Sequence, residues 1–324
     1  MARETIVIDR DIPFIAGAFE PWFDVRYLSG RDIGPADVRA AVALVIRTRT
    51  RCDASLLEGS SVRLIATATI GTDHIDLPYC AMRGIAVASA PGCNAAAVAQ
   101  YVAVALHALD FDHPGKTFGI IGVGHVGTKV AEAARRAGLQ VLLNDPPRAA
   151  AEGPATFTPL PDLLAQSDIV TLHIPLWPEN RDFADAAFFA AMKPGASLIN
   201  ASRGEVLDEE ALLAARGRLG KLVFDVWKHE PDINRDLLAA ADIATPHIAG
   251  YSIQGKINGT QAVVRAVGEA FGIAPLQRFE IRNVELPEEP YAIFADDSAL
   301  RCNPEAFESL RSDYRYRNDR LMPF

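Results

Sequence analysis

The stretch FGIIGVGHVGTKVAEAARRAGLQVLLND, residues Phe118–Asp145, contains an apolar run, a glycine motif and a helical pattern in direct succession. Gly122, Gly124 and Gly127 have the spacing G-x-G-x-x-G. The first glycine permits a tight turn, the second lets the backbone approach a pyrophosphate, and the third lets a helix pack closely on a strand. Asp145 ends the next apolar run, where a carboxylate can accept hydrogen bonds from ribose hydroxyls. Because strand, helix and acidic residue all surround the glycines, we predict a dinucleotide-binding βαβ unit and not an ordinary turn.

The start of the helix after the glycines is expected to hold the phosphates, because its unpaired N–H groups and positive dipole end face that loop. The cofactor-binding residues predicted here are Gly122, Gly124, His125, Val126 and Gly127. We expect NAD and not NADP, because Asp145 would repel a 2′-phosphate. The nearest arginine, Arg148, follows two prolines that are expected to direct the chain away.

Short apolar runs alternate with helical patterns along most of the chain, which is typical of an α/β fold with parallel strands. The first segment carries four such runs, Thr5–Asp9, Val42–Thr48, Arg63–Ala68 and Ile85–Ala88. A helix predicted over Ala95–Leu109 separates them from the glycine unit. Six further strands with helices between them follow up to His247, which predicts a Rossmann-type doubly wound sheet. Residues 252–271 form one more long helical pattern.

Three motifs stand where strands of the second segment are predicted to end, the edge at which open α/β sheets bind ligands. They are LINASRG with Arg203, DVWKHEP with Asp225 and Glu230, and TPHIAGY with His247. Each alone is ordinary, but together they bring a cation, a carboxylate and an imidazole to a sheet that carries a dinucleotide motif.

This set suits the oxidation of a 2-hydroxy acid. Hydride transfer to a nicotinamide requires a base for the hydroxyl proton, and histidine titrates in the required range. A neighbouring carboxylate favours the imidazolium and orients the ring. An arginine can hold the substrate carboxylate and polarise the forming carbonyl.

The motifs, in this order, resemble those of the D-isomer-specific 2-hydroxyacid dehydrogenases. The resemblance implies Arg203, Glu230 and His247 as catalytic residues. It implies NAD contacts for Asp145, Asp225, Gly250 and the segment Ala201, Ser202, Arg203.

Two further stretches, ATATIGTDHID (Ala66–Asp76) and SAPGCNAAAVAQYV (Ser89–Val102), are similar to one branch of this family. Members of that branch oxidise 4-phospho-D-erythronate in vitamin B6 biosynthesis. The branch implies substrate contacts for Arg47, Thr48, Thr69 and Tyr251, and a homodimer. The first residues run directly into a strand-like pattern without the apolar core of a signal peptide, so we expect a cytoplasmic enzyme. Two alternatives stay open: a phosphoglycerate- or hydroxypyruvate-type dehydrogenase, and a non-catalytic NAD-sensing protein.

The predicted organisation has two α/β domains and a short tail. A discontinuous, flavodoxin-like substrate domain comprises 1–92 and 248–272, and the NAD-binding domain comprises 93–247. The segment 273–324 is shorter than the C-terminal dimerisation domain usual in the branch, so we expect a reduced dimerisation segment.

An arginine row supports an anionic substrate. Arg47, Arg49 and Arg51 alternate at the end of a predicted strand and would share one face. The protein carries a net charge of -9, so arginines grouped near a site are informative. The alternative is a solvated strand edge.

The remaining composition argues against other classes of protein. A basic face of the kind that binds nucleic acid is not evident, and no apolar run is long enough to span a membrane. The four cysteines are far apart and include no C-x-x-C pair, which argues against a disulfide framework and a metal site. We expect no metal, no nucleic acid and no membrane partner.

Overall fold

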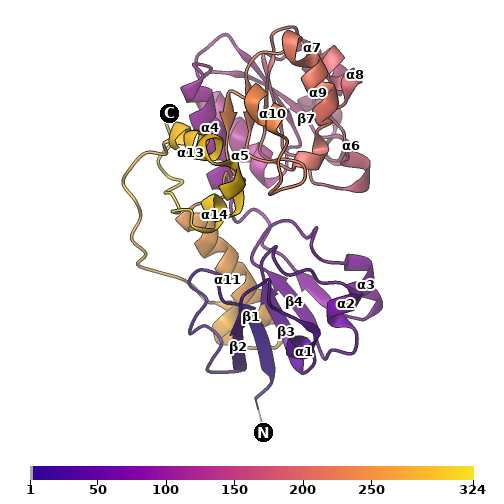
Figure 1. Ribbon diagram of the computed structural model, residues 1–324, viewed down its shortest axis with the longest axis vertical. Helices are drawn as coiled ribbons and strands as arrows, with labels where there is room; N and C mark the ends of the chain where they lie inside the picture. Colours follow the sequence, from indigo (N-terminus) through magenta and orange to yellow (C-terminus); the bar gives the residue numbers. More distant parts are fainter. Residues whose placement is uncertain (1–2) are drawn as a thin grey trace. The chain divides into compact units, whose positions relative to one another are not determined.

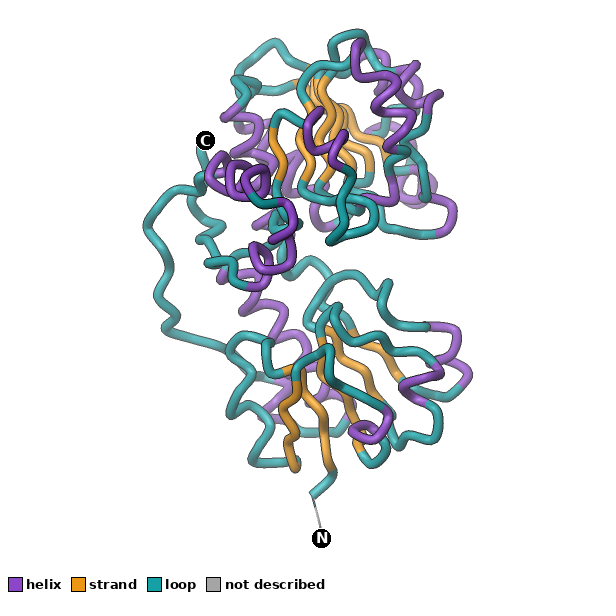
Figure 2. The backbone as a smooth tube through the Cα atoms, in the orientation of Figure 1, coloured by secondary structure: helices purple, strands orange, loops and turns teal. Residues whose placement is uncertain are grey.

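The computed structural model describes residues 3–324, which form two compact units (Figure 1). Unit 1 contains the residues up to Asn94 together with Ile253–Leu286, and unit 2 contains Ala95–Ser252 together with Pro287–Phe324. Each unit has a parallel sheet with helices around it (Figure 2). The predicted fold class, a Rossmann-type α/β protein, is therefore confirmed.

Unit 1 contains a five-stranded sheet of order β2-β1-β3-β4-β5, which is the flavodoxin-like order. One strand was not predicted: β2 lies at the sheet edge, and its sequence DVRYL is partly exposed and charged. The strands are β1 (Thr5–Asp9), β2 (Asp24–Leu28), β3 (Ala41–Ile46), β4 (Leu64–Thr67) and β5 (Ala86–Ala88). The helices are α1 (Pro35–Val38), α2 (Ala54–Leu57), α3 (Leu77–Met82), α11 (Ile253–Ala270) and α12 (Ala274–Gln277).

The sheet of unit 1 is covered on both faces because successive side chains of a strand point to opposite sides. Ile6 and Ile8 of β1 belong to a cluster with Val263 and Val267 of α11. Val7, between them, belongs to a second cluster that contains residues of α1, α2 and α3. Helix α11 therefore returns to the first segment and completes its core.

Unit 2 contains a six-stranded parallel sheet of order β11-β10-β9-β8-β6-β7. The strand order reverses at β6, so the loop after this strand lies at a ligand-binding position of the sheet. The strands are β6 (Thr117–Ile121), β7 (Gln140–Asn144), β8 (Ile169–Leu172), β9 (Ser197–Asn200), β10 (Leu222–Phe224) and β11 (Ile243–Ala244). The helices before and between them are α4 (Ala95–Ala108), α5 (His125–Arg136), α6 (Pro146–Glu152), α7 (Leu160–Gln166), α8 (Ala186–Ala191), α9 (Glu209–Ala215) and α10 (Arg235–Ala240). Short 3₁₀ turns are η1 (Pro154–Thr156), η2 (Pro178–Asn180), η3 (Gly204–Val206) and η4 (Arg216–Arg218).

The C-terminal segment is divided between the two units. Its first part, with α12, belongs to unit 1, whereas α13 (Ile293–Cys302), η5 (Pro304–Ala306) and α14 (Phe307–Ser312) belong to unit 2. Leu300 and Phe307 are buried in the same cluster as residues of β8, β9 and β10. Asp297 of α13 accepts a hydrogen bond at 2.7 Å from the backbone of Ala244 in the edge strand β11. Helix α13 therefore covers part of the sheet edge of unit 2.

Among residues 3–324, no helix combines the length and apolar character that crossing a bilayer would require.

Candidate active site

The glycine loop follows β6, as the sequence predicts, and its geometry fits a dinucleotide. Gly122 has a φ of +85°, a conformation that favours glycine. A Cβ atom added to Gly127 would lie 2.0 Å from the carbonyl oxygen of Gly122, whereas one added to Gly124 would meet nothing within 4 Å. The helix is thus packed tightly against the turn, while the space beside Gly124 is open. Helix α5 begins at His125, directly after Gly124, so its first N–H groups stand at this open space, where they suit an anion.

Asp145 holds the glycine loop in place. One of its carboxylate oxygens accepts from the backbone N–H of Val123 at 2.8 Å, and the other accepts from the N–H of Arg148 at 3.0 Å, which caps α6. The expectation that the prolines direct Arg148 away is wrong. Its guanidinium donates to the carbonyl of Val123 at 2.6 Å. The two prolines are the first residues of α6, so Arg148 lies in the first turn of that helix, next to the loop that Asp145 holds. Two hydrogen bonds to Glu152, of 2.6 and 2.8 Å, balance the charge of Arg148.

Arg203 follows β9 in a loop that Asn200 organises. The side chain of Asn200 accepts from the N–H and the hydroxyl of Ser202 and donates to the carbonyl of Arg203 at 2.9 Å. A Cβ atom on the next residue, Gly204, would lie 2.0 Å from the backbone of Trp227. This close approach brings the Arg203 loop against the loop that carries Glu230. Arg203, Ser202 and Ala201 are all partly buried.

Asp225, one residue after β10, is 1% exposed and holds the loop that follows β11. Its oxygens accept from the Thr245 hydroxyl at 2.7 Å and from the backbone N–H groups of Ile248 and Ala249 at 2.8 and 2.9 Å. Burial raises the pKa of Asp225, an effect that the nearby His247 and these hydrogen bonds reduce but do not cancel. The contacts give Asp225 a structural role around His247, and its contact with NAD stays a prediction.

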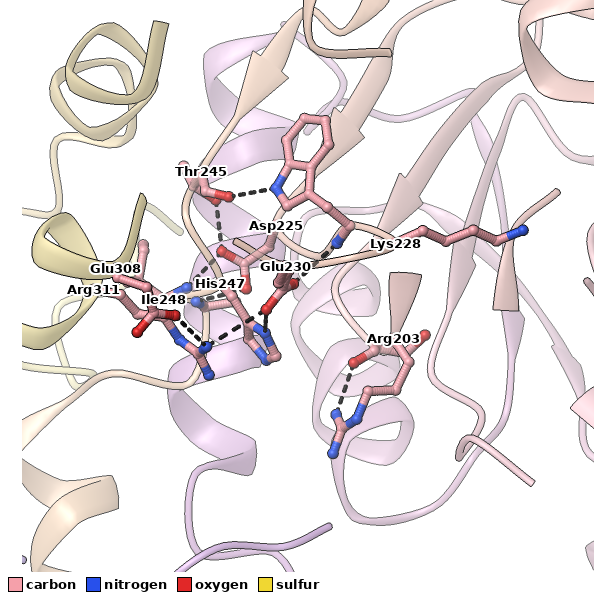
Figure 3. Close-up of polar contacts among 12 residues, drawn as sticks. Arg203, Asp225, Lys228, Glu230, Thr245, His247, Ile248, Glu308 and Arg311 are labelled. Atoms are coloured by element: carbon pink, nitrogen blue, oxygen red, sulfur yellow. Dashed lines mark hydrogen bonds and ion pairs between the residues drawn. The ribbon is translucent and has the colours of Figure 1, made fainter. Parts of the chain in front are cut away.

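His247 and Glu230 form a hydrogen-bonded pair (Figure 3). His247 Nδ1 lies 2.8 Å from Glu230 Oε2. His247 has a φ of +57°, and its N–H donates to the carbonyl of Asp225 at 2.7 Å, which helps to hold this unusual backbone conformation. Burial would raise the pKa of Glu230, but His247, Arg311 and the N–H of Trp227 together lower it below its ordinary value. The carboxylate is thus ionised beside the imidazole.

Arg311 of α14 joins this pair from the C-terminal segment. Its Nη1 lies 3.5 Å from Glu230 Oε2, the oxygen that also contacts His247 (Figure 3). Arg311 was not among the site residues predicted from the sequence. The only signal was its place in an Arg- and Tyr-rich tail, and nothing in the spacing indicates a contact with a residue 81 positions earlier.

The loop that carries Gly250 and Tyr251 is held by Arg317, another residue that was not predicted from the sequence. The guanidinium of Arg317 donates to the carbonyls of Ile248 at 2.8 Å and Ala249, and to the side chain of Gln100 at 2.9 Å. Tyr251 packs edge-on against Tyr314 and Tyr316 from the same C-terminal segment.

The predicted substrate residues Arg47, Thr48 and Thr69 lie in unit 1. Arg47 Nε lies 2.8 Å from Oδ2 of Asp9, which is fully buried, and its Nη2 lies 2.9 Å from Asp11. Two carboxylates of unit 1 therefore already share this guanidinium. Asp9 was not singled out from the sequence.

The expected one-faced arginine row is wrong. Strand β3 ends at Ile46, and the chain turns at Thr48 and Arg49. The three arginines therefore lie beyond the strand, where side chains no longer alternate between two faces. Arg51 is 84% exposed and pairs with Asp53 at 2.7 Å.

Thr69 lies in the loop after β4 and is held by polar contacts. Its hydroxyl is 2.8 Å from that of Thr67 and donates to the carbonyl of Gly71 at 3.3 Å. The Thr67 hydroxyl is also 3.3 Å from His74 Nε2. Among residues 3–324, no three or more acidic, His or Cys side chains are grouped so that they could hold a metal ion.

Known proteins are similar to this chain over most of its length. Residues 97–249 match the family described as D-isomer specific 2-hydroxyacid dehydrogenase, NAD binding domain. A protein of Bacteroides fragilis named erythronate-4-phosphate dehydrogenase is 45% identical over 336 residues, which cover 97% of each chain. A protein of the same name from Chromohalobacter salexigens is 47% identical over 278 residues, covering 83% of this chain and 73% of its own. The relatives thus differ in how much of their length this chain matches.

Solved structures have the same fold. D-Lactate dehydrogenase from Aquifex aeolicus, complexed with NAD and lactic acid, is similar with a TM-score of 0.71 at 26% identity, covering 84% of this chain and 96% of that one. The NAD⁺-bound 3-phosphoglycerate dehydrogenase of Entamoeba histolytica is similar with a TM-score of 0.72 at 22% identity, covering 88% and 100% of the two chains. The second likeness concerns the fold alone.

Proposed function

The chain belongs to the erythronate-4-phosphate dehydrogenase family, and from this membership we propose that it oxidises 4-phospho-D-erythronate at C2 with NAD. The product is 2-oxo-3-hydroxy-4-phosphobutanoate, and the place of the reaction is vitamin B6 biosynthesis. The observation that carries the proposal is the hydrogen bond of 2.8 Å between His247 Nδ1 and Glu230 Oε2. A histidine held in this way can serve as a base for a hydroxyl proton.

His247 takes the proton of the C2 hydroxyl. Because Glu230 accepts from Nδ1, the favoured neutral tautomer carries its proton on Nδ1 and presents Nε2 as the acceptor. When Nε2 has taken the substrate proton, the carboxylate of Glu230 stabilises the resulting imidazolium. The bound NAD supplies the acceptor for the hydride that leaves C2.

Arg203 binds and polarises the reacting end of the substrate. Its loop is packed against the Glu230 loop through the close approach of Gly204 to Trp227. A guanidinium can donate two parallel hydrogen bonds to a carboxylate. It also stabilises the negative charge that develops on the C2 oxygen.

Asp145 would hold the ribose of NAD and Asp225 would lie near the nicotinamide. The other residues that would contact NAD are Gly122, Gly124, His125, Val126 and Gly127 of the glycine loop, and Ala201, Ser202, Arg203 and Gly250. The open space beside Gly124 and the N–H groups at the start of α5 support the phosphate position. Asp145 already accepts two backbone hydrogen bonds, and a carboxylate oxygen has lone pairs left for a ribose hydroxyl.

Arg47, Thr48, Thr69 and Tyr251 are proposed to contact the substrate, with Arg47 at the phosphate. Arg47 already binds Asp9 and Asp11 through Nε and Nη2, and a guanidinium carries five N–H donors, so we propose that the same group also contacts the phosphate. Replacing Arg47 by lysine keeps a cation for Asp9 and removes the forked donor. Arg47→Lys should lower kcat/KM for the phosphorylated acid by about 10-fold or more, from the 1.5–3 kcal/mol of a charged hydrogen bond. The kcat/KM of Arg47→Lys for unphosphorylated erythronate should stay close to that of the wild type. If kcat/KM falls by the same factor for both acids, Arg47 does not recognise the phosphate.

The test of the proposed function is NADH formation with a panel of 2-hydroxy acids. We expect the highest kcat/KM for 4-phosphoerythronate, well above erythronate, 3-phosphoglycerate, glycerate and lactate. A clear preference for another acid would favour a different dehydrogenase of the family. Saturable NAD binding without turnover of any acid would favour the NAD sensor.

We also propose a homodimer, from the family resemblance, and a cytoplasmic location, from the sequence of the first residues. Sedimentation of the purified chain tests the first.

A further inference from the structure

We propose that Arg311 is a positioning residue that shares the negative charge of Glu230 with His247 and thereby sets the pH at which His247 can accept a proton. The inference rests on the proposed role of His247 as the base. It assigns a task in the reaction to the C-terminal helix α14, which the sequence predicted only as part of a dimerisation segment.

The geometry of the carboxylate carries the inference (Figure 3). Glu230 Oε2 is 2.8 Å from His247 Nδ1 and 3.5 Å from Arg311 Nη1, while Oε1 accepts from the N–H of Trp227 at 3.1 Å. The side chains of Arg311 and Glu230 are only 14% and 16% exposed, so solvent screens the interaction weakly. Because both nitrogens contact one oxygen, the guanidinium and the imidazole lie within about 6 Å of each other, the range in which one charge shifts the titration of another.

Packing alone does not account for a buried guanidinium at this position. Arg311 Nε is buried and has no hydrogen-bond acceptor among residues 3–324. Such a group costs stability that an apolar side chain of similar size would not cost. Phe307, fully buried in the core of unit 2, already anchors α14. The charge is therefore held beside Glu230 at a cost to stability.

Arg311 remains charged under all assay conditions. Burial lowers its pKa, but Tyr251, Glu230 and Glu308 outweigh this effect and raise the pKa above its ordinary value. It is thus a fixed positive charge on the carboxylate that His247 also contacts.

Other charged groups near His247 and Glu230 also favour or oppose the imidazolium form of His247. Asp225, from the loop after β10, interacts with His247 and adds to the effect of Glu230. Glu308, on α14, lies 3.9 Å from Arg311 and weakens the guanidinium's effect. Lys228 is directed away and pairs with Asp182.

Two acidic groups therefore favour the imidazolium, and Arg311 opposes them. Arg311 thus makes the imidazolium less favourable than the two carboxylates alone would make it, and this opposing effect is what the experiment measures.

The experiment compares the acid limb of the pH profile of kcat/KM for oxidation in three variants. Arg311→Met should move this limb to higher pH by about 1 unit, because the imidazolium loses its opposing charge. Glu230→Gln should move it to lower pH. Arg311→Lys retains the charge and should leave the limb near that of the wild type, which separates charge from packing.

A substrate-binding role for Arg311 predicts a different pattern. In that case Arg311→Met would raise KM for the acid and leave the limb in place, and this result would overturn the inference. A limb that moves in the same direction in Arg311→Met and Glu230→Gln would overturn it as well.

A second readout does not need turnover. The ring protons of His247 can be followed by NMR against pH, with His247→Asn identifying their signals. The inference expects the midpoint to rise in Arg311→Met and to fall in Glu230→Gln. An unchanged midpoint in Arg311→Met would refute the charge-sharing role, whereas absent turnover with shifted midpoints would refute the proposed function alone.

Discussion

Replacing Arg47 by alanine should destabilise unit 1 strongly, before any question of substrate arises. Arg47 Nε lies 2.8 Å from Oδ2 of Asp9, and Asp9 is fully buried at the end of β1. Without Arg47, the carboxylate keeps a backbone hydrogen bond of 3.0 Å from Asp11 but loses its cation. Removing one partner of a buried ion pair costs about 3–5 kcal/mol, because the other charge is left uncompensated.

Arg51 provides the matched control within the same loop. It also pairs with an aspartate, Asp53, at 2.7 Å, but its side chain is 84% exposed. Exposed pairs contribute about 0–1 kcal/mol, so Arg51→Ala should have little effect. A third variant, Asp9→Asn with Arg47→Met, removes both charges and should recover at least half of the loss.

The free energy of unfolding of unit 1 should be measured by hydrogen exchange with mass spectrometry. A single melting curve is less suitable, because two units can unfold separately. Peptides covering β1 and β3 should exchange faster in Arg47→Ala by a factor that corresponds to about 3–5 kcal/mol, and peptides of unit 2 should not change. Equal, small effects of Arg47→Ala and Arg51→Ala on β1 and β3 would refute the reasoning. Arg47 would then be available to a ligand without a structural role.

The other predictions concern the cofactor, the base and acid stability. His247→Asn should lower kcat by about 10²–10⁴-fold, the usual contribution of acid–base catalysis, with NAD affinity retained; a smaller loss would exclude His247 as the base. Gly127→Ala should weaken NADH binding in a fluorescence titration and destabilise the chain by about 1–3 kcal/mol, because its Cβ would lie 2.0 Å from a carbonyl oxygen; Gly124→Ala meets no atom and should not destabilise. Asp145→Ala should weaken NAD binding and reduce discrimination against NADP, and equal wild-type efficiency with both cofactors would contradict this. Burial lowers the pKa of His173 to about 3, so this group stabilises the fold above pH 6.5 and the stability is lost as the pH falls. Between pH 7 and pH 5 the loss should be on the order of 1–2 kcal/mol and absent in His173→Asn, as urea unfolding can check.

The glycine unit could be read from the sequence because every part of it is local. Strand, turn and helix follow within Phe118–Asp145, and the structure forms β6, α5 and β7 there. The strands of unit 2 were predictable for the same reason, since buried parallel strands appear as uninterrupted apolar runs. Strand β2 was not, because an edge strand with charged residues lacks that pattern.

The long-range contacts around the site could not be predicted. The arginine row failed because strand periodicity was extended beyond Ile46, where the chain turns. The direction of Arg148 depends on α6, which begins at the two prolines and is capped by Asp145, so that Arg148 stands in the first helical turn beside the loop. Arg311 meets Glu230 only because α13 and α14 pack on the core of unit 2, and one sequence contains no signal for that docking.

The central claim, that the chain removes a hydride from C2 of 4-phosphoerythronate, is tested most directly with substrate that carries deuterium at C2. Incubation with NAD should yield reduced cofactor one mass unit heavier than NADH, together with the 2-oxo product, and His247→Asn should form both far more slowly. Reduced cofactor without deuterium would show that the hydride comes from another carbon. NAD bound without any reduced cofactor would contradict the account as a whole.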